Sequence, residues 1–161
     1  MRHNLLNRFA TFLRLPLPSR WLLAEAWIAQ VTVAVGLRVA PAAVVQGRLA
    51  EFASRARSTP AFDRSVIVPV CWAIEATARC VPSDKCLIRA LAGQILLARR
   101  GDRATLRIGV LRSSDGGLHA HAWLVSGRKI VIGGAEANRY EALPDWRADR
   151  SRQTRPAGAS Q

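Results

Sequence analysis

Apolar residues recur at helical spacing through the first half of the chain. Within the apolar stretch 21–45, this pattern predicts a first helix, which Pro41 ends because proline cannot continue a helical hydrogen-bond ladder. Further helices are predicted over 42–56 and 66–79, each bounded by turn-forming residues. We therefore expect residues 1–80 to form a helical N-terminal subregion.

The first of these helices has the composition of a signal peptide or membrane anchor, since arginines precede a long apolar run. However, Glu25, Gln30 and Arg38 interrupt the run. The uninterrupted part is shorter than the roughly 20 residues that cross a bilayer. We therefore expect a packed helix and no membrane span. Free thiols and the lack of an export signal favour a cytoplasmic location.

After residue 81 the pattern changes to one helix followed by strands. Ser83 can cap this helix and Gly101 ends it, and the apolar positions between them keep helical spacing. Alternation and turn signals then predict three short strands, at 104–111, 118–125 and 129–132. The predicted fold is α+β, in which residues 81–147 form one helix packed on an antiparallel sheet. Residues 148–161 are expected to form a basic, disordered tail.

Cys86 lies near the start of the predicted helix. A thiol in this position is close to the positive end of the helix dipole, and Lys85 beside it also favours the thiolate. On the second predicted strand, His119, His121 and Trp123 share one face because side chains alternate. A histidine on that face can serve as the base for a cysteine nucleophile.

Four runs of residues in the second half of the chain resemble a known family: CLIRALAGQILLARRG, LRIGV, AHAWLVSGRKIVIGG and RYEAL. They are similar to the leader peptidases of lasso-peptide biosynthesis, in the transglutaminase-like branch of the papain-type cysteine peptidases. The resemblance implies removal of the leader from a ribosomally synthesised precursor peptide. A separate ATP-dependent cyclase then closes an isopeptide ring on the freed core. The resemblance also places Cys86 as the nucleophile and His121, in the His-Ala-Trp motif, as the base.

The third catalytic group departs from the family pattern. Where many relatives have an aspartate at the end of the third strand, this chain has Gly133-Gly134, and the nearest carboxylate is Glu136. The resemblance therefore assigns Glu136 as the third catalytic residue. Another polar group or a backbone carbonyl could partly substitute, because the role is to orient the histidine and stabilise its charged form. Three other carboxylates are less favoured: Asp115, Glu141 and Asp145.

These residues also have structural interpretations. A buried cysteine is usually a small apolar core residue, and we interpret Cys71 in this way because it lies in an apolar run. Cys80 and Cys86 are only a weak match to a zinc framework, since three cysteines without Cys-x-x-Cys pairs give no paired framework. His119 with His121 could ligate a metal from one strand face, but so short a motif recurs by chance. No cofactor and no metal are expected.

Two alternative functions stay open. Transglutaminase-type acyl transfer would use the same nucleophile and base, with an amine in place of water. A non-catalytic basic adaptor that binds the precursor peptide or nucleic acid is the second alternative. Binding by such an adaptor would be salt-sensitive and would survive loss of the thiol.

The chain has 161 residues and a formal net charge of +13, which fits a single domain with a basic surface. Arginine supplies nearly all of the positive charge, since Lys85 and Lys129 are the only lysines. The arginines are scattered and few aromatics interleave with them, so nucleic acid is not the expected partner. A basic surface instead suits an acidic leader or a partner that binds the leader.

Two missing motifs point to a split system. The chain has no Gly-x-x-x-x-Gly-Lys phosphate loop, so ATP dependence would come from the cyclase. It also has no evident leader-recognition module. The expected partners are therefore the precursor peptide, a small leader-binding protein and the lasso cyclase.

Overall fold

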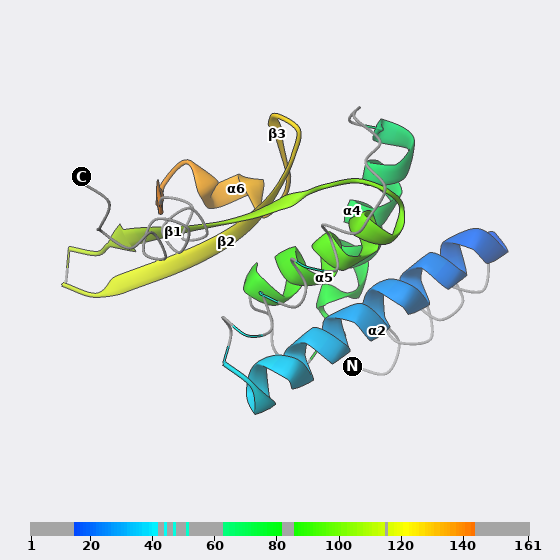
Figure 1. The fold of residues 1–161 in the computed structure, drawn as a ribbon, viewed down its shortest axis with the longest axis horizontal. Helices are drawn as coiled ribbons and strands as arrows, with labels where there is room; N and C mark the ends of the chain where they lie inside the picture. Colours follow the sequence, from blue (N-terminus) through cyan, green and yellow to red (C-terminus); the bar gives the residue numbers. More distant parts are fainter. Residues whose placement is uncertain are drawn as a thin grey trace, which may run out of the picture.

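The computed structural model describes residues 15–41, 44, 47, 51, 63–81, 86–114 and 116–143. The elements of these residues follow in the order α2 (Leu17–Val39), α4 (Arg64–Ala78), α5 (Cys86–Arg99), β1 (Thr105–Arg112), β2 (Leu118–Ser126), β3 (Lys129–Ile132), α6 (Gly134–Ala137) and β4 (Glu141–Ala142) (Figure 1). The four strands form one antiparallel sheet in the order β3-β2-β1-β4. The predicted α+β fold and the three predicted strands are confirmed.

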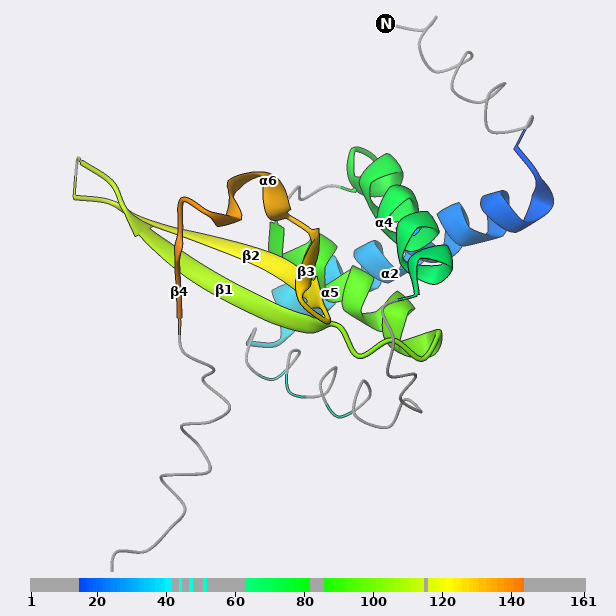
Figure 2. The same ribbon diagram turned by 90° about the horizontal axis from the view of Figure 1, so that it is seen from above.

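Helix α5 is the central element of the fold. It contacts both α2 and α4 on one side and the sheet, chiefly β2, on the other (Figures 1 and 2). Its fully buried residues include Leu91, Leu96 and Leu97. One apolar core extends from Leu23 of α2 through α5 to Ile132 of β3. The N-terminal helices and the sheet therefore share a core.

Helix α2 is joined to its neighbours by polar contacts as well as apolar ones. Glu25 forms ion pairs with Arg99 and Arg100 near the end of α5, at 2.9 and 2.5 Å. Gln30 is 1% exposed, and its Nε2 donates to the Ile74 carbonyl of α4 at 3.2 Å. A buried amide must satisfy its hydrogen bonds within the protein. Glu25 and Gln30, which interrupt the apolar run in the sequence, therefore hold α2 against α5 and α4.

In the part of the chain that the structure describes, α2 is the one helix long and apolar enough to cross a membrane. Its most apolar 18-residue window has a mean hydropathy of 1.5, and 33% of that window is buried. Length and composition alone are weak evidence for a span, because core helices pass the same test. The buried face of α2 packs against α4 and α5, as predicted for a packed helix.

The register of the sheet determines where β3 ends. β2 and β3 form a tight hairpin in which Ser126 pairs with Lys129, and a bulge shifts the register between Leu124 and Val125. The shift brings Ile132 opposite Leu124. Gly133 is thereby placed against Ala122 and Trp123. The bulge therefore determines that Gly133, the residue after β3, lies beside β2, the strand that carries His121.

Several predictions concern residues that are largely outside the described ranges. Of the helix predicted over 42–56, only Val44, Gly47 and Glu51 are described, and all three are helical. Ser83 and Lys85, expected at the start of α5, and the tail 148–161 lie outside the described residues. Helix α6 and strand β4 were not predicted.

Candidate active site

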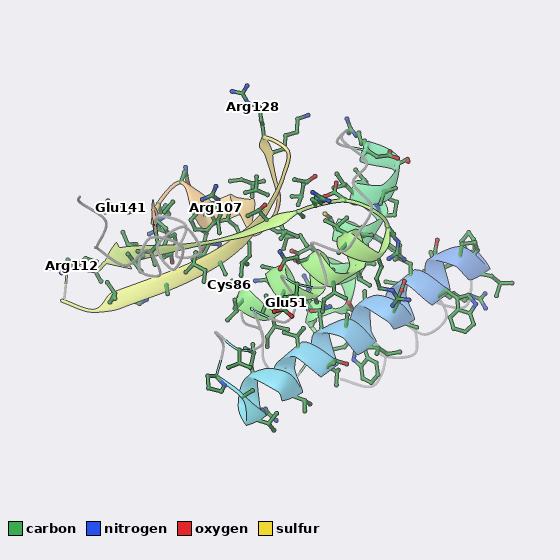
Figure 3. All side chains as sticks on the ribbon, viewed as in Figure 1. Glu51, Cys86, Arg107, Arg112, Arg128 and Glu141 are labelled. Atoms are coloured by element: carbon green, nitrogen blue, oxygen red, sulfur yellow. The ribbon has the colours of Figure 1, made fainter. Side chains whose placement is uncertain are left out.

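Cys86 is the first described residue of α5 (Figure 3). It is partly buried and packs against the apolar core. Its Sγ accepts a hydrogen bond from the backbone N–H of Ala122 in β2, at 3.4 Å. The fold thus brings together two positions 36 residues apart and sets the thiol against the strand beside His121.

His121 is partly buried in the middle of β2. Its Nε2 lies 2.9 Å from the carbonyl oxygen of Gly133. Because a carbonyl oxygen only accepts hydrogen bonds, this contact requires the proton on Nε2 and leaves Nδ1 as the basic nitrogen of the neutral ring. The arrangement prepares Nδ1 to accept a proton.

Two aromatic rings hold the imidazole of His121. Trp123 stacks on it with ring centroids 6.0 Å apart, and Tyr140 does so at 5.1 Å. Trp123 is 6% exposed, and Gly109 of β1 leaves room for its indole, since a Cβ at Gly109 would lie 2.7 Å from that ring. Ring stacking restricts the rotation of the imidazole and excludes water from its faces.

Gly133 directly follows β3, where the resemblance implied an aspartate. Its φ is +76°, in the left-handed region, and an added Cβ would lie 2.9 Å from the Ala122 carbonyl oxygen. Both constraints favour glycine. In the described structure, the partner of His121 Nε2 is therefore a backbone carbonyl, which the sequence interpretation had named as a possible substitute for a carboxylate.

A cavity of about 390 Å³ opens at the imidazole. Its walls comprise His121, Gly133 and the first residues of α6 with Glu136, and the Glu75–Arg89 ion pair, which is 3.1 Å long. Glu136 is exposed in the first turn of α6. It thus shares the cavity with His121, and its assignment as third catalytic residue stays a prediction.

Comparison with known families identifies the chain. Residues 27–145 match the model described as the transglutaminase-like superfamily, and this match covers more than half of the chain. The protein belongs to the transglutaminase-like superfamily. No curated protein and no solved structure matched the chain. The family match begins within α2, well before the runs in the second half that carried the resemblance.

The transglutaminase-like superfamily generally includes cysteine-dependent enzymes, and membership is compatible with a peptidase or an acyltransferase. Of the two residues expected to carry that chemistry, Cys86 contacts the backbone N–H of Ala122, the strand residue next to His121. His119 is exposed on β2 and does not line the cavity. No group of three potential metal ligands occurs among the described residues.

The other two cysteines differ from Cys86 in their surroundings. Cys71 is partly buried in α4, and burial raises the pKa of its thiol to about 11. It is therefore a neutral thiol at physiological pH, in agreement with its interpretation as a core residue. Cys80 is exposed beyond the end of α4. All three cysteines are free.

Sequence reasoning missed several residues of the site. Tyr140 lies within the run RYEAL, but nothing in that run indicates stacking on a histidine. Glu75 and Arg89 come from different helices and carry no sequence signal. The Gly-Gly pair was the one signal available for Gly133, since glycine tolerates a positive φ.

Proposed function

We propose that this protein is a cysteine peptidase that removes the leader from a lasso-peptide precursor. The observation that carries the proposal is the contact of Cys86 Sγ with the strand residue next to His121. The resemblance of the surrounding runs to leader peptidases supplies the substrate class. The enzyme acts in the cytoplasm with a small leader-binding protein and an ATP-dependent cyclase.

In the proposed mechanism, His121 Nδ1 takes the proton of Cys86 and the thiolate attacks the carbonyl carbon between leader and core. Backbone N–H groups at the start of α5 hold the oxyanion. The imidazolium gives its proton to the departing core amine, and the leader remains as a thioester on Cys86. Water, deprotonated by His121, then attacks the thioester and releases the leader as a carboxylic acid with return of the thiol.

The proposal divides the third catalytic role between two groups. The Gly133 carbonyl orients the ring through Nε2, at 2.9 Å. Glu136 faces the same cavity and supplies negative charge that favours the imidazolium. A carbonyl can hold the tautomer but carries no net charge, so a carboxylate nearby complements it.

The test is mass spectrometry of a lasso precursor incubated with the protein and the leader-binding partner. Wild type should release the core with the gain of one water, and folded Cys86→Ala should release none. Cys80→Ala is the matched control, because Cys80 is exposed and outside the site. Turnover by folded Cys86→Ala at the wild-type rate would contradict the proposal.

The same measurement separates hydrolysis from acyl transfer. With an added primary amine, a transglutaminase-type reaction on a glutamine side chain would join amine to peptide with loss of ammonia. The superfamily match is compatible with this chemistry as well. A crosslinked product and no free core would favour the acyltransferase.

A further inference from the structure

A second, larger cavity lies between α4 and β3. Its volume is about 540 Å³, within the roughly 300–1,000 Å³ typical of ligand pockets. One wall is a single face of α4, since the residues recur at helical spacing: Arg64, Ile67, Val68, Cys71, Trp72 and Glu75. The other wall is β3. We refer to this cavity as the α4–β3 groove.

The walls of the α4–β3 groove are apolar and partly open to solvent. Val68 is 50% exposed, Trp72 44% and Ile130 46%. Cys71 between them is a neutral thiol, because burial raises its pKa to about 11, so it adds apolar surface and no charge. Apolar side chains converging from two elements can enclose a bulky apolar group.

The groove adjoins the cavity at His121. Glu75 lines both the α4–β3 groove and the cavity at His121. Its carboxylate is held in the ion pair with Arg89. We expect a chain lying in the groove to reach the cavity at His121 past Glu75.

The edge of β3 offers backbone groups to an extended chain. β3 is an outer strand of the sheet, and a two-residue turn joins it to β2. In such a hairpin the pair next to the turn, Ser126 and Lys129, exchanges hydrogen bonds. By alternation, Ile130 directs its N–H and C=O away from β2, as needed for an added peptide strand.

The charges around the groove favour an acidic chain. Arg64 and Lys129 are among its lining residues, and Arg128 projects from the tip of the β2–β3 hairpin (Figure 3). The lining carboxylate of Glu75 is already neutralised by Arg89. Positive charge at both walls complements acidic residues that flank an apolar one.

We infer that the α4–β3 groove is a specificity subsite, which receives a bulky apolar side chain of an extended, acidic substrate peptide. The inference rests on the proposed peptidase function and deepens it. The peptide backbone pairs with Ile130, its apolar side chain lies between Val68 and Trp72, and its acidic neighbours face the basic residues at the rim.

The experiment measures binding in the full-length Cys86→Ala background, so that it does not depend on turnover. The probes are three fluorescein-labelled hexapeptides of alternating residues: Asp with Leu, Asp with Ala, and Lys with Leu. Fluorescence anisotropy should give a Kd at least about tenfold lower for the Asp-Leu peptide than for the other two, a difference of about 1.4 kcal/mol. Equal affinity for the three peptides would overturn the inference.

A matched pair of variants locates the binding. Val68 in the groove and Val35 on α2 are 50% and 52% exposed, so aspartate is tolerated equally at either position. Val68→Asp should weaken Asp-Leu binding at least about tenfold, and Val35→Asp, which adds the same charge elsewhere, less than about twofold. Equal losses in the two variants would overturn the inference.

Failure of the inference and failure of the proposed function give different results. If the precursor is not cleaved by wild type but the Val68→Asp effect on binding holds, the peptidase proposal fails and the groove stands as a peptide site. If the precursor is cleaved and Val68→Asp changes neither peptide Kd nor the KM for cleavage, the subsite is wrong and the peptidase proposal stands.

Discussion

At the scale of single residues, the histidine is oriented by a backbone atom. Nε2 of His121 lies 2.9 Å from the carbonyl oxygen of Gly133, and two aromatic rings stack on the imidazole. A backbone carbonyl is held in place by the fold itself and needs no side-chain rotamer. The tautomer that a base requires can therefore persist without an aspartate at this position.

The two histidines of β2 should respond differently to substitution. His121→Ala should lower kcat by about 10²–10⁴-fold, because it removes general-base activation of the thiol. His119→Ala should change kcat less than about threefold, since its side chain is exposed and outside the cavity. Single-turnover cleavage of the precursor measures both. Equal losses, with stoichiometric zinc in the purified protein, would instead support a metal site.

Glu136→Gln tests the division of the third catalytic role. The substitution removes charge but leaves the contact between His121 and Gly133, so we expect the rate to fall about tenfold or less. Peptide affinity should stay unchanged, and Glu136→Asp should recover part of the rate. A fall of a thousandfold in Glu136→Gln would make this carboxylate the orienting group and would contradict the role given to the carbonyl.

At the scale of elements, the site depends on close approaches that glycine permits. Gly93 lets α5 lie against the sheet, because a Cβ there would be 3.3 Å from a methyl of Leu124 and would displace Ile132. Gly109 lets the Trp123 indole pack against the backbone of β1. The Gly93 contact sets the distance between the helix that carries Cys86 and the sheet, and the Gly109 contact positions the indole that stacks on His121.

Gly109→Ala should impair both stability and catalysis. The new Cβ would lie 2.7 Å from the Trp123 ring and 2.9 Å from the Glu141 carbonyl of β4. Such overpacking typically costs about 1–3 kcal/mol of unfolding free energy, which urea denaturation measures. The rate should fall as well, because the displaced indole stacks on His121.

Gly47→Ala is the control for this prediction. Nothing lies within 4 Å of a Cβ added at this helical glycine, so stability should be kept or slightly increased. Wild-type stability and rate in Gly109→Ala would show that the sheet accommodates the methyl group and that the stacking is not needed.

At the scale of the whole molecule, a helical layer and a sheet enclose one core, and the surface is strongly basic. Ion pairs of Glu25 with Arg99 and Arg100 join the first described helix to the central one. The formal net charge of +13 is unaffected by these pairs, because it already counts Glu25 against the arginines. A field of this sign attracts acidic peptides over distances longer than any single contact.

Binding of an acidic peptide should therefore weaken with salt. Raising sodium chloride from about 0.1 M to 1 M shortens the Debye length from about 10 Å to 3 Å, so we expect the Kd of the Asp-Leu peptide to rise by about tenfold or more. A neutral Ser-Leu hexapeptide should show little change. A Kd of the acidic peptide that is independent of salt would indicate that the net charge plays no part in substrate capture.

Much of the fold could be predicted from the sequence, and two candidate site residues could be named from it. The helix predicted over 66–79 is found at Arg64–Ala78, and the strand predicted over 118–125 at Leu118–Ser126. These elements follow from periodicities of a few residues, which are local properties of the chain. Cys86 and His121 were likewise indicated by short local motifs.

Only the tertiary structure placed the groups that surround these residues. The carbonyl of Gly133, the ring of Tyr140 and the α4–β3 groove arise where separate elements meet. The two-residue strand β4 forms only by pairing with β1, so its own residues give no strand pattern. Local spacing predicts which face of an element is apolar, but the close approach of two faces depends on bulges, glycines and the packing of the whole core.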